Sequence, residues 1–253
     1  MTVPFESSPL LDAMPHGFFG RKGGSSNGHF AENNMSIAIG DTPLLVDENR
    51  TGAAAAIGFR RAQLYLLKQV HSNRVHTLAE RPTGDQPIEA DAMVTRLPLL
   101  ALGILTADCA PILLADPRSG VIGAAHAGWR GAVDGIVGNT IAAMVDLGAD
   151  PATTIAAIGP TISHQNYEVG PQFMADFIEL WSNGWRYFSA PHGGRAHFDL
   201  PAFVADQLKI AGVGQIDRVG TCTYGAPERY FSHRYATHHG TITGRQIAII
   251  GRA

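Results

Sequence analysis

Three residues of metal-binding types stand out by their positions in this sequence: His71, Cys109 and His126. Each stands at or near the end of an apolar, strand-like segment, so one sheet could bring all three to the same edge. A thiolate and two imidazoles suit zinc or copper, and three protein ligands leave a fourth position for water or substrate. Spacing alone leaves a plainer alternative open, in which Cys109 is a small buried hydrophobe and both histidines are hydrogen-bonded in the core.

Two glycine-containing segments could bind an anion. In "GRKGGSSNG", residues 20–28, glycines free the backbone to point several N–H groups into one concavity, and Arg21 adds positive charge. The alternative for this segment is a flexible surface loop. "GWRG", residues 128–131, precedes a predicted helix, so Arg130 and the helix N-terminus could hold an anion, unless Arg130 simply pairs with an acid.

Other polar side chains give weaker signals. Asp108, next to Cys109, is a candidate for orienting a metal ligand or for handling a proton. Tyr167 in "NYEVG" could stack on a ring of a substrate, although packing in the core explains it equally well. Four histidines in polar surroundings are expected to be exposed and receive no role: His192, His197, His238 and His239.

The apolar pattern predicts the elements that must position these residues. Strands are predicted within residues 62–72, 100–109, 110–117, 120–128, 154–160 and 245–251. Helices are predicted at residues 47–59, at Ala132–Leu147 with Gly148 as the C-terminal cap, and at residues 170–184 and 199–213. Because strands and helices do not alternate strictly, the pattern favours the α+β class. We expect one domain over residues 1–253, with a mixed β-sheet layered with helices in an α/β/α-like arrangement.

Composition excludes several function classes. The 253 residues carry a net charge of −3, so there is no basic field for nucleic acid. The N-terminus lacks the pattern of a signal peptide, and the apolar stretch from Leu97 to Ala115 contains Pro98, Asp108 and Pro111, which favours a buried sheet over a membrane span. Two cysteines suit a reducing compartment, so a cytoplasmic protein is expected. Its oligomeric state is left open.

A set of short segments gives the sequence a family resemblance. They occur in this order: "HGFFGRKGGSS", "NNMSIAIGD", "ENR", "KQVHSNRVH", "EADAMVT", "TADCAPILLAD", "AAHAGWRG", "AIGPTISHQNYEVG", "FDL", "CTY", "RYFSHR" and "TGRQ". The chain thereby resembles, over nearly its whole length, the YfiH/laccase-domain family, also called the multicopper polyphenol oxidase or purine nucleoside phosphorylase family. The resemblance implies that His71, Cys109 and His126 bind a metal, usually zinc, in a single layered domain with a mixed sheet.

The family resemblance implies more than one activity. Members phosphorolyse adenosine, inosine or methylthioadenosine and deaminate adenosine, others have been called copper laccases, and one branch removes wrongly built peptidoglycan precursors. A laccase needs roughly ten histidine and cysteine ligands in close pairs, whereas this chain has one adjacent pair, His238–His239. The leading hypothesis is therefore a zinc-dependent purine nucleoside enzyme, in which Arg21 holds phosphate for phosphorolysis and a water activated by the metal serves deamination.

Three alternatives to this hypothesis remain. The first is a copper-dependent polyphenol oxidase. The second is a metal-free hydrolase or amidase, with Cys109 as nucleophile and His126 as its base, acting on peptidoglycan precursors. The third is a non-catalytic nucleotide-binding module whose metal is structural. Near its end the chain also departs from the family's usual "SYRR", having Ser232-His233-Arg234-Tyr235 instead, so the role of residues 233–239 is open.

Overall fold

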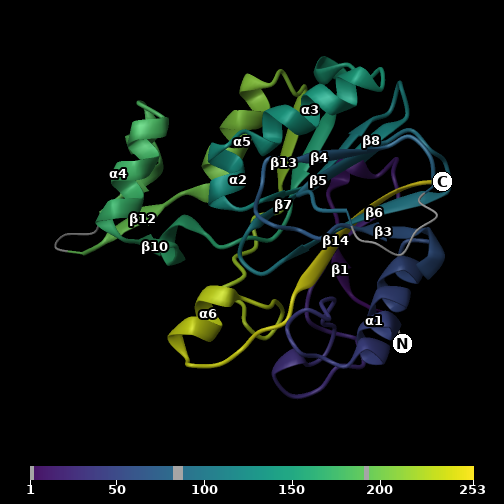
Figure 1. Ribbon diagram of the computed structural model, residues 1–253, viewed down its shortest axis with the longest axis horizontal. Helices are drawn as coiled ribbons and strands as arrows, with labels where there is room; N and C mark the ends of the chain where they lie inside the picture. Colours follow the sequence, from purple (N-terminus) through teal and green to yellow (C-terminus); the bar gives the residue numbers. More distant parts are fainter. Residues whose placement is uncertain (1–2, 82–87, 191–193) are drawn as a thin grey trace.

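Two stacked β-sheets form the centre of the structure (Figure 1). The computed structural model describes residues 3–81, 88–190 and 194–253. The five-stranded sheet has the order β1 (Phe5–Glu6), β2 (His16–Phe19), β14 (Gln246–Arg252), β6 (Leu100–Thr106) and β3 (Leu64–Leu66). The six-stranded sheet has the order β13 (Gln215–Arg218), β9 (Ile155–Ile158), β7 (Ala110–Asp116), β8 (Val121–Ala127), β5 (Ala92–Thr95) and β4 (Val75–Leu78). Both sheets mix parallel and antiparallel pairs.

Helices cover the outer faces of both sheets (Figure 1). The six α-helices of the described residues are α1 (Pro43–Ala56), α2 (Trp129–Val133), α3 (Ile136–Asp146), α4 (Pro171–Leu180), α5 (Leu200–Ile210) and α6 (His233–His238). Helices α2, α3 and α5 lie over the six-stranded sheet, and α1 lies against the five-stranded sheet. A small sheet of β10 (Glu168–Val169), β12 (Ala196–Phe198) and β11 (Phe188–Ser189) lies with α4 to one side.

The central strands have apolar side chains on both faces because both faces are covered. In β14, Ile247 and Ile249 belong to the cluster that contains α1, whereas Ala248 and Ile250 belong to the cluster between the sheets. This division follows from the alternation of side chains along a strand. It explains why the sequence shows continuous apolar runs here and no alternation of apolar and polar residues.

The α+β class and the layering of a mixed sheet with helices are confirmed, and the second stacked sheet is a feature that the apolar pattern did not reveal. The single-domain interpretation of residues 1–253 stays a prediction. The stretch from Leu97 to Ala115 forms β6 and β7, which belong to different sheets. No helix in the described part of the chain combines the length and the apolar character needed to cross a membrane.

Some predicted details are wrong. The first helix begins at Pro43 and not at Asp47, because Thr42–Pro43 provides a start with a preset backbone angle. His197 is half-buried, with Nδ1 placed 3.2 Å from the carbonyl of His164, while His238 and His239 are exposed as expected. His192 lies outside the described residues.

The helix predicted over Ala132–Leu147 is also interrupted. Helix α2 ends at Val133 and α3 begins at Ile136, with Gly135 between them at a φ of 93°. This left-handed angle costs an L-residue about 1–2 kcal/mol. The sequence pattern missed the break because the buried face continues across it.

We expect Gly135→Ala to lower the free energy of unfolding by about 1–2 kcal/mol, because alanine is strained at this angle. An added Cβ would meet no neighbour there, so the conformation alone sets the cost. Gly138→Ala is the matched control: Gly138 lies in α3 with open space around it, so alanine should stabilise the protein by about 0.5–1 kcal/mol. Urea denaturation measures both, and equal effects at the two sites would contradict the assigned break.

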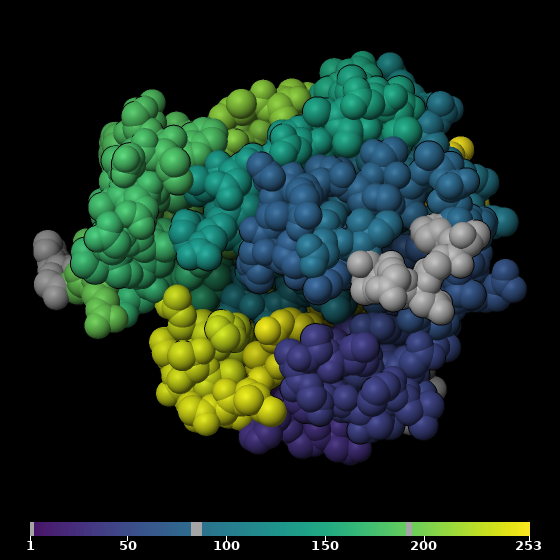
Figure 2. All heavy atoms as spheres, in the orientation of Figure 1, coloured from purple at the N-terminus to yellow at the C-terminus, as the bar shows by residue number. Residues whose placement is uncertain are grey.

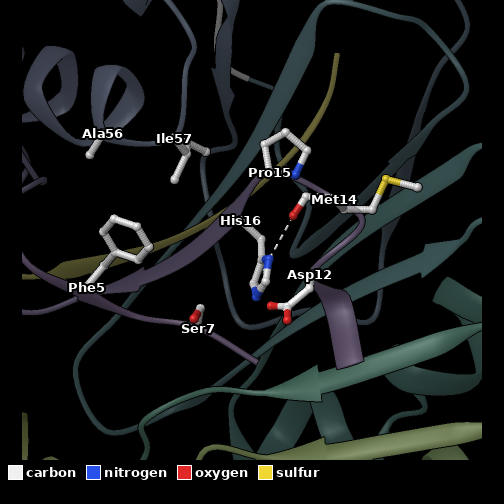
Figure 3. A pocket seen from close by; sticks show the side chains of 8 residues that line it. All are labelled: Phe5, Ser7, Asp12, Met14, Pro15, His16, Ala56 and Ile57. Atoms are coloured by element: carbon white, nitrogen blue, oxygen red, sulfur yellow. Dashed lines mark hydrogen bonds between the residues drawn. The ribbon is translucent and has the colours of Figure 1, made fainter. Parts of the chain in front are cut away.

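An open pocket lies between the N-terminal strands and the end of α1 (Figure 3). It is lined by Phe5, Ser7, Asp12, Met14, Pro15, His16, Ala56 and Ile57. The His16 ring is held at both nitrogens, since Nδ1 donates to the Met14 carbonyl at 2.8 Å and Nε2 accepts from the Ser8 N–H at 2.9 Å. The imidazole is thus used to hold the N-terminal segment, and no lining residue belongs to the predicted metal site.

Candidate metal centre

His71, Cys109 and His126 come together at one edge of the six-stranded sheet. Their ligand atoms all lie within 4.8 Å of one another. His126 is near the end of β8, Cys109 directly precedes β7, and the pairing of these two strands brings the two residues close. His71 comes from the segment between β3 and β4, with Nε2 placed 3.9 Å from Cys109 Sγ. Parts of the chain up to 55 positions apart therefore present their donor atoms to one point.

The arrangement suits a metal ion. Ligand atoms around tetrahedral zinc are roughly 3.5 Å apart, close to the 3.9 Å between Cys109 Sγ and His71 Nε2. Gly128 keeps space beside these atoms: a Cβ there would lie 3.0 Å from His71 Cδ2 and 3.2 Å from Cys109 Sγ. His126 is buried, Cys109 is half-buried and His71 is exposed, so the cluster extends from the core to solvent.

Without a metal, the cluster favours an ion pair. Burial opposes ionisation of Cys109, but the charge of His126 and hydrogen bonds from both histidines lower its pKa to about 6. Burial likewise opposes the charge on His126, yet the negative charges of Cys109 and Asp91 raise the pKa of His126. At neutral pH the metal-free pair is therefore a thiolate beside an imidazolium.

This pairing predicts a pH dependence of alkylation. In metal-free Cys222→Ala protein, where Cys109 is the remaining thiol, the rate of reaction with iodoacetamide should rise through a midpoint near pH 6. For free cysteine the corresponding midpoint lies at about pH 8.5. Since the thiolate is the nucleophile, reactivity is lost as the pH falls below the midpoint. Mass spectrometry of the labelled protein gives the rate at each pH, and a midpoint above pH 8 would exclude the ion pair.

The carboxylate that contacts His126 is Asp91, to which the sequence interpretation gave no role. Asp91 directly precedes β5, is fully buried, and accepts a hydrogen bond from His126 Nδ1 at 2.8 Å. This bond directs His126 Nε2 toward the cluster. The signal that could have found Asp91 is an acid at the start of a buried apolar strand, because a buried acid needs partners.

Asp108 lies next to Cys109 but faces other groups. Its two carboxylate oxygens accept from Thr223 Oγ1 and from the Arg234 N–H, each at 2.6 Å. Its carbonyl accepts from Thr161 Oγ1, also at 2.6 Å. Asp108 thus ties the turn that carries Cys109 to the C-terminal segment, a geometry that favours orientation of the turn over proton transfer.

Part of the glycine-rich loop is bonded within the protein. The N–H groups of Gly23, Ser25 and Ser26 donate to acceptors within the protein, so they are not available to an anion. Folding thus uses three of the donors that the sequence suggested for an anion, and the anion-binding role of the segment stays a prediction. The Arg21 guanidinium donates two hydrogen bonds, to the carbonyls of Ala31 and Pro227. Its three other N–H groups have no acceptor among the residues that the structure describes.

Arg21 lies where the two ends of the chain meet. Figure 2 shows the C-terminal segment, in yellow, against the N-terminal segment, in purple, on one face of the molecule. The Arg21 N–H donates to the Arg229 carbonyl at 2.8 Å, and the Arg21 guanidinium lies 4.7 Å from the Phe231 ring centre. Arg130 is exposed beside Trp129, and no carboxylate pairs with it among the described residues.

Tyr167 contributes both to the core and to the surroundings of the cluster. Its ring packs against Phe173 and Phe198, and the Arg234 guanidinium lies 5.2 Å from its centre. Burial, and next the negative charge of Cys109, raise the pKa of Tyr167 well above its usual range. The hydroxyl therefore keeps its proton and can act as a donor.

Two basic residues near the cluster were missed. Arg245 is influenced by the charges of Cys109 and Asp108, which oppose the lowering of its pKa by burial. The Arg234 guanidinium bonds the Glu168 carbonyl at 2.6 Å. Both arginines lie in segments noted for the family resemblance, "RYFSHR" and "TGRQ", but their distance along the chain from Cys109 hid their position.

Fold and site together define a class of protein: an α+β architecture with one Cys–His₂ cluster at a sheet edge and basic side chains beside it. The chain belongs to the family described as multi-copper polyphenol oxidoreductase laccase, which it matches over residues 15–253. This match confirms the predicted relationship to the YfiH/laccase-domain group.

Named relatives and solved structures agree with this placement. A purine nucleoside phosphorylase of Deinococcus radiodurans is 41% identical over 249 residues, which cover 98% of this chain and 93% of the relative. The hypothetical protein YfiH of Bacillus licheniformis has a TM-score of 0.88 at 29% identity, with coverage of 96% and 94%. Protein NMB0706 of Neisseria meningitidis has a TM-score of 0.87 at 31% identity, with coverage of 100% and 99%. The relatives' names support an enzyme.

Proposed function

We propose that this protein is a purine nucleoside phosphorylase with one metal ion at His71, Cys109 and His126. The observation that carries the proposal is the Cys–His₂ cluster with basic side chains next to it. Within the described residues this is the one group of its kind, which fits a single ion better than several coppers. The names of the relatives support the purine nucleoside and phosphate as substrates. We place the activity in the cytoplasm, in keeping with two free cysteines.

Zinc is the metal we propose, because a thiolate and two imidazoles suit it and leave a position open. When bound, zinc supplies Lewis-acid stabilisation of negative charge and no redox chemistry. His126 would bind the zinc through Nε2, since its Nδ1 is hydrogen-bonded to Asp91. Cys109 contributes as thiolate, the form that the neighbouring histidines already favour.

The remaining side chains would bind and orient the two substrates. In phosphorolysis a phosphate oxygen bonds to C1′ of the ribose while the bond from C1′ to the purine breaks, and the purine leaves with the electron pair and takes up a proton. Arg21 would hold the phosphate through its remaining N–H groups, with Arg245 and Arg130 as further cationic groups. The Tyr167 hydroxyl, which stays protonated, would donate a hydrogen bond to the nucleoside.

The test is base release from inosine or adenosine with and without phosphate. Chromatography should detect hypoxanthine or adenine, with ribose 1-phosphate, when zinc-loaded protein and phosphate are both present. Inosine formed from adenosine reports deamination, which uses water and should not depend on phosphate. Base release that is independent of phosphate would reject the phosphorylase. Oxidation of a phenol by copper-loaded protein would instead support the alternative function of a polyphenol oxidase.

A Cys–His hydrolase or amidase is the second candidate, favoured by the thiolate–imidazolium pair. Its turnover would persist in metal-free protein and disappear after alkylation of Cys109. Peptidoglycan precursors that carry a wrong amino acid are its test substrates. A nucleotide-binding module without catalysis would instead bind the nucleoside and leave it unchanged.

A further inference from the structure

One buried carboxylate contacts both histidine-bearing segments of the cluster. Asp91 has no solvent exposure, and its side chain accepts five hydrogen bonds. One comes from the His126 ring, and the others come from residues 70–72. A buried charge with this many donors is a built arrangement, because each unpaired donor would cost free energy.

The His71 side of this arrangement is strained. His71 has a φ of 58°, in the left-handed region that a residue with a Cβ rarely adopts. The N–H groups of Val70, His71 and Ser72 all point to the Asp91 carboxylate, at 3.2, 3.0 and 2.6 Å. Successive N–H groups around a left-handed residue form a concavity for an anion. Here Asp91 is that anion, and it stabilises the backbone turn from which the His71 ring extends to Cys109.

The His126 side is held through the ring and through the backbone. His126 Nδ1 donates to Asp91 Oδ1 at 2.8 Å, and the His126 N–H donates to the Asp91 carbonyl at 2.7 Å. The pairing of β5 with β8 places Asp91 beside His126, since Ala92 is opposite Ala125. The ring bond keeps a proton on Nδ1, so Nε2, which faces the cluster, is the nitrogen that gives up its proton when a metal binds.

We propose that Asp91 is the positioning residue for the metal site, acting on both histidines through different atoms. It orients the His126 ring directly, and it orients His71 by holding the backbone of residues 70–72 in the left-handed turn. The inference rests on the metal site of the proposed function. It adds to that site the residue that orients the two histidine ligands before the ion binds.

Asp91→Asn should raise the zinc dissociation constant about 10–100-fold, the usual effect of removing a group that orients a metal ligand. An amide has one acceptor oxygen and presents an NH₂ group to the other donors, so it cannot satisfy both segments. Competition with a chelator of known affinity measures the constant directly, without use of turnover.

Asp116→Asn is the matched control. Asp116 is also buried and accepts four hydrogen bonds, from Arg118, Ser119, Asp150 and Thr153. It stands at the end of β7 remote from Cys109, which precedes the strand's first residue. We therefore expect the Asp116→Asn variant to be less stable than the wild-type protein and to keep the wild-type zinc affinity. Equal zinc affinities of Asp91→Asn and wild-type protein would overturn the inference, as would an equal loss in both variants.

A measurement on metal-free wild-type protein covers the case in which Asp91→Asn does not fold. Nitrogen-15 NMR should show a protonated Nδ1 on His126 that exchanges slowly with water, because its proton lies between the ring and Asp91. An unprotonated Nδ1 would overturn the orientation of His126. Wild-type protein that binds no zinc but shows this proton would contradict the proposed function and leave the contact with Asp91 intact.

Discussion

Replacing Cys109 with alanine is expected to remove metal binding and turnover together, each by at least about 100-fold. Cys109 is the one thiolate among the three ligand atoms, so its loss leaves two imidazoles and no anionic ligand. The fold should persist, because Cys109 is in a turn before β7 and is only half-buried. Elemental analysis gives the metal content, and phosphate-dependent base release gives the turnover.

Cys222→Ala provides the control. Cys222 is also half-buried, and its Sγ accepts from the N–H of Ser163 at 3.3 Å, outside the cluster of three. This variant should keep both the metal and the activity. Full metal content in Cys109→Ala would show that the ligand assignment is wrong. A content near four coppers, with a blue absorption band, would contradict the single zinc.

Replacing Arg21 with alanine is expected to reduce phosphate-dependent efficiency by about ten- to a hundred-fold. A hydrogen bond to a charged group contributes roughly 1.5–3 kcal/mol, which corresponds to this range. The loss should appear in the KM for phosphate, while the KM for the nucleoside changes little. Inosine formation from adenosine uses water as the nucleophile and should be largely spared. Chromatography of adenine, hypoxanthine and inosine separates the two reactions.

The structure adds a control to this experiment. Arg21 also connects two loops by its bonds to Ala31 and Pro227, so the variant should melt at a lower temperature. Assays are therefore run well below the melting temperature, beside Arg61→Ala, which removes a surface arginine paired with Asp47 and should leave both reactions unchanged. If Arg21→Ala raises both KM values equally, or weakens cleavage and deamination alike, phosphate is not held by Arg21.

Local sequence signals predicted much of the framework. Apolar runs indicated the strands that became β6, β7, β8, β9 and β14. A Pro near the start and a Gly at the end of each segment indicated α4 and α5. Because His71, Cys109 and His126 stand at or near the ends of apolar segments, one sheet could bring them to the same edge, where the structure places them. From spacing alone, burial of all three in the core was an open alternative. Their role as metal ligands stays a prediction. These signals are readable because strand and helix periodicity is set by neighbouring residues.

Other features depended on which strands pair. Asp91 contacts His126, 35 positions away, only because β5 lies against β8. Arg245 comes near Cys109 because β14 pairs with β6, where Gln246 is opposite Thr106. Three N–H groups of the 20–28 loop donate to Glu32 and Asn49, which no local pattern connects to the loop. A residue's type and neighbours establish what bonds it can make, but a buried carboxylate or N–H group takes its partner from whatever the packed strands bring within about 3 Å.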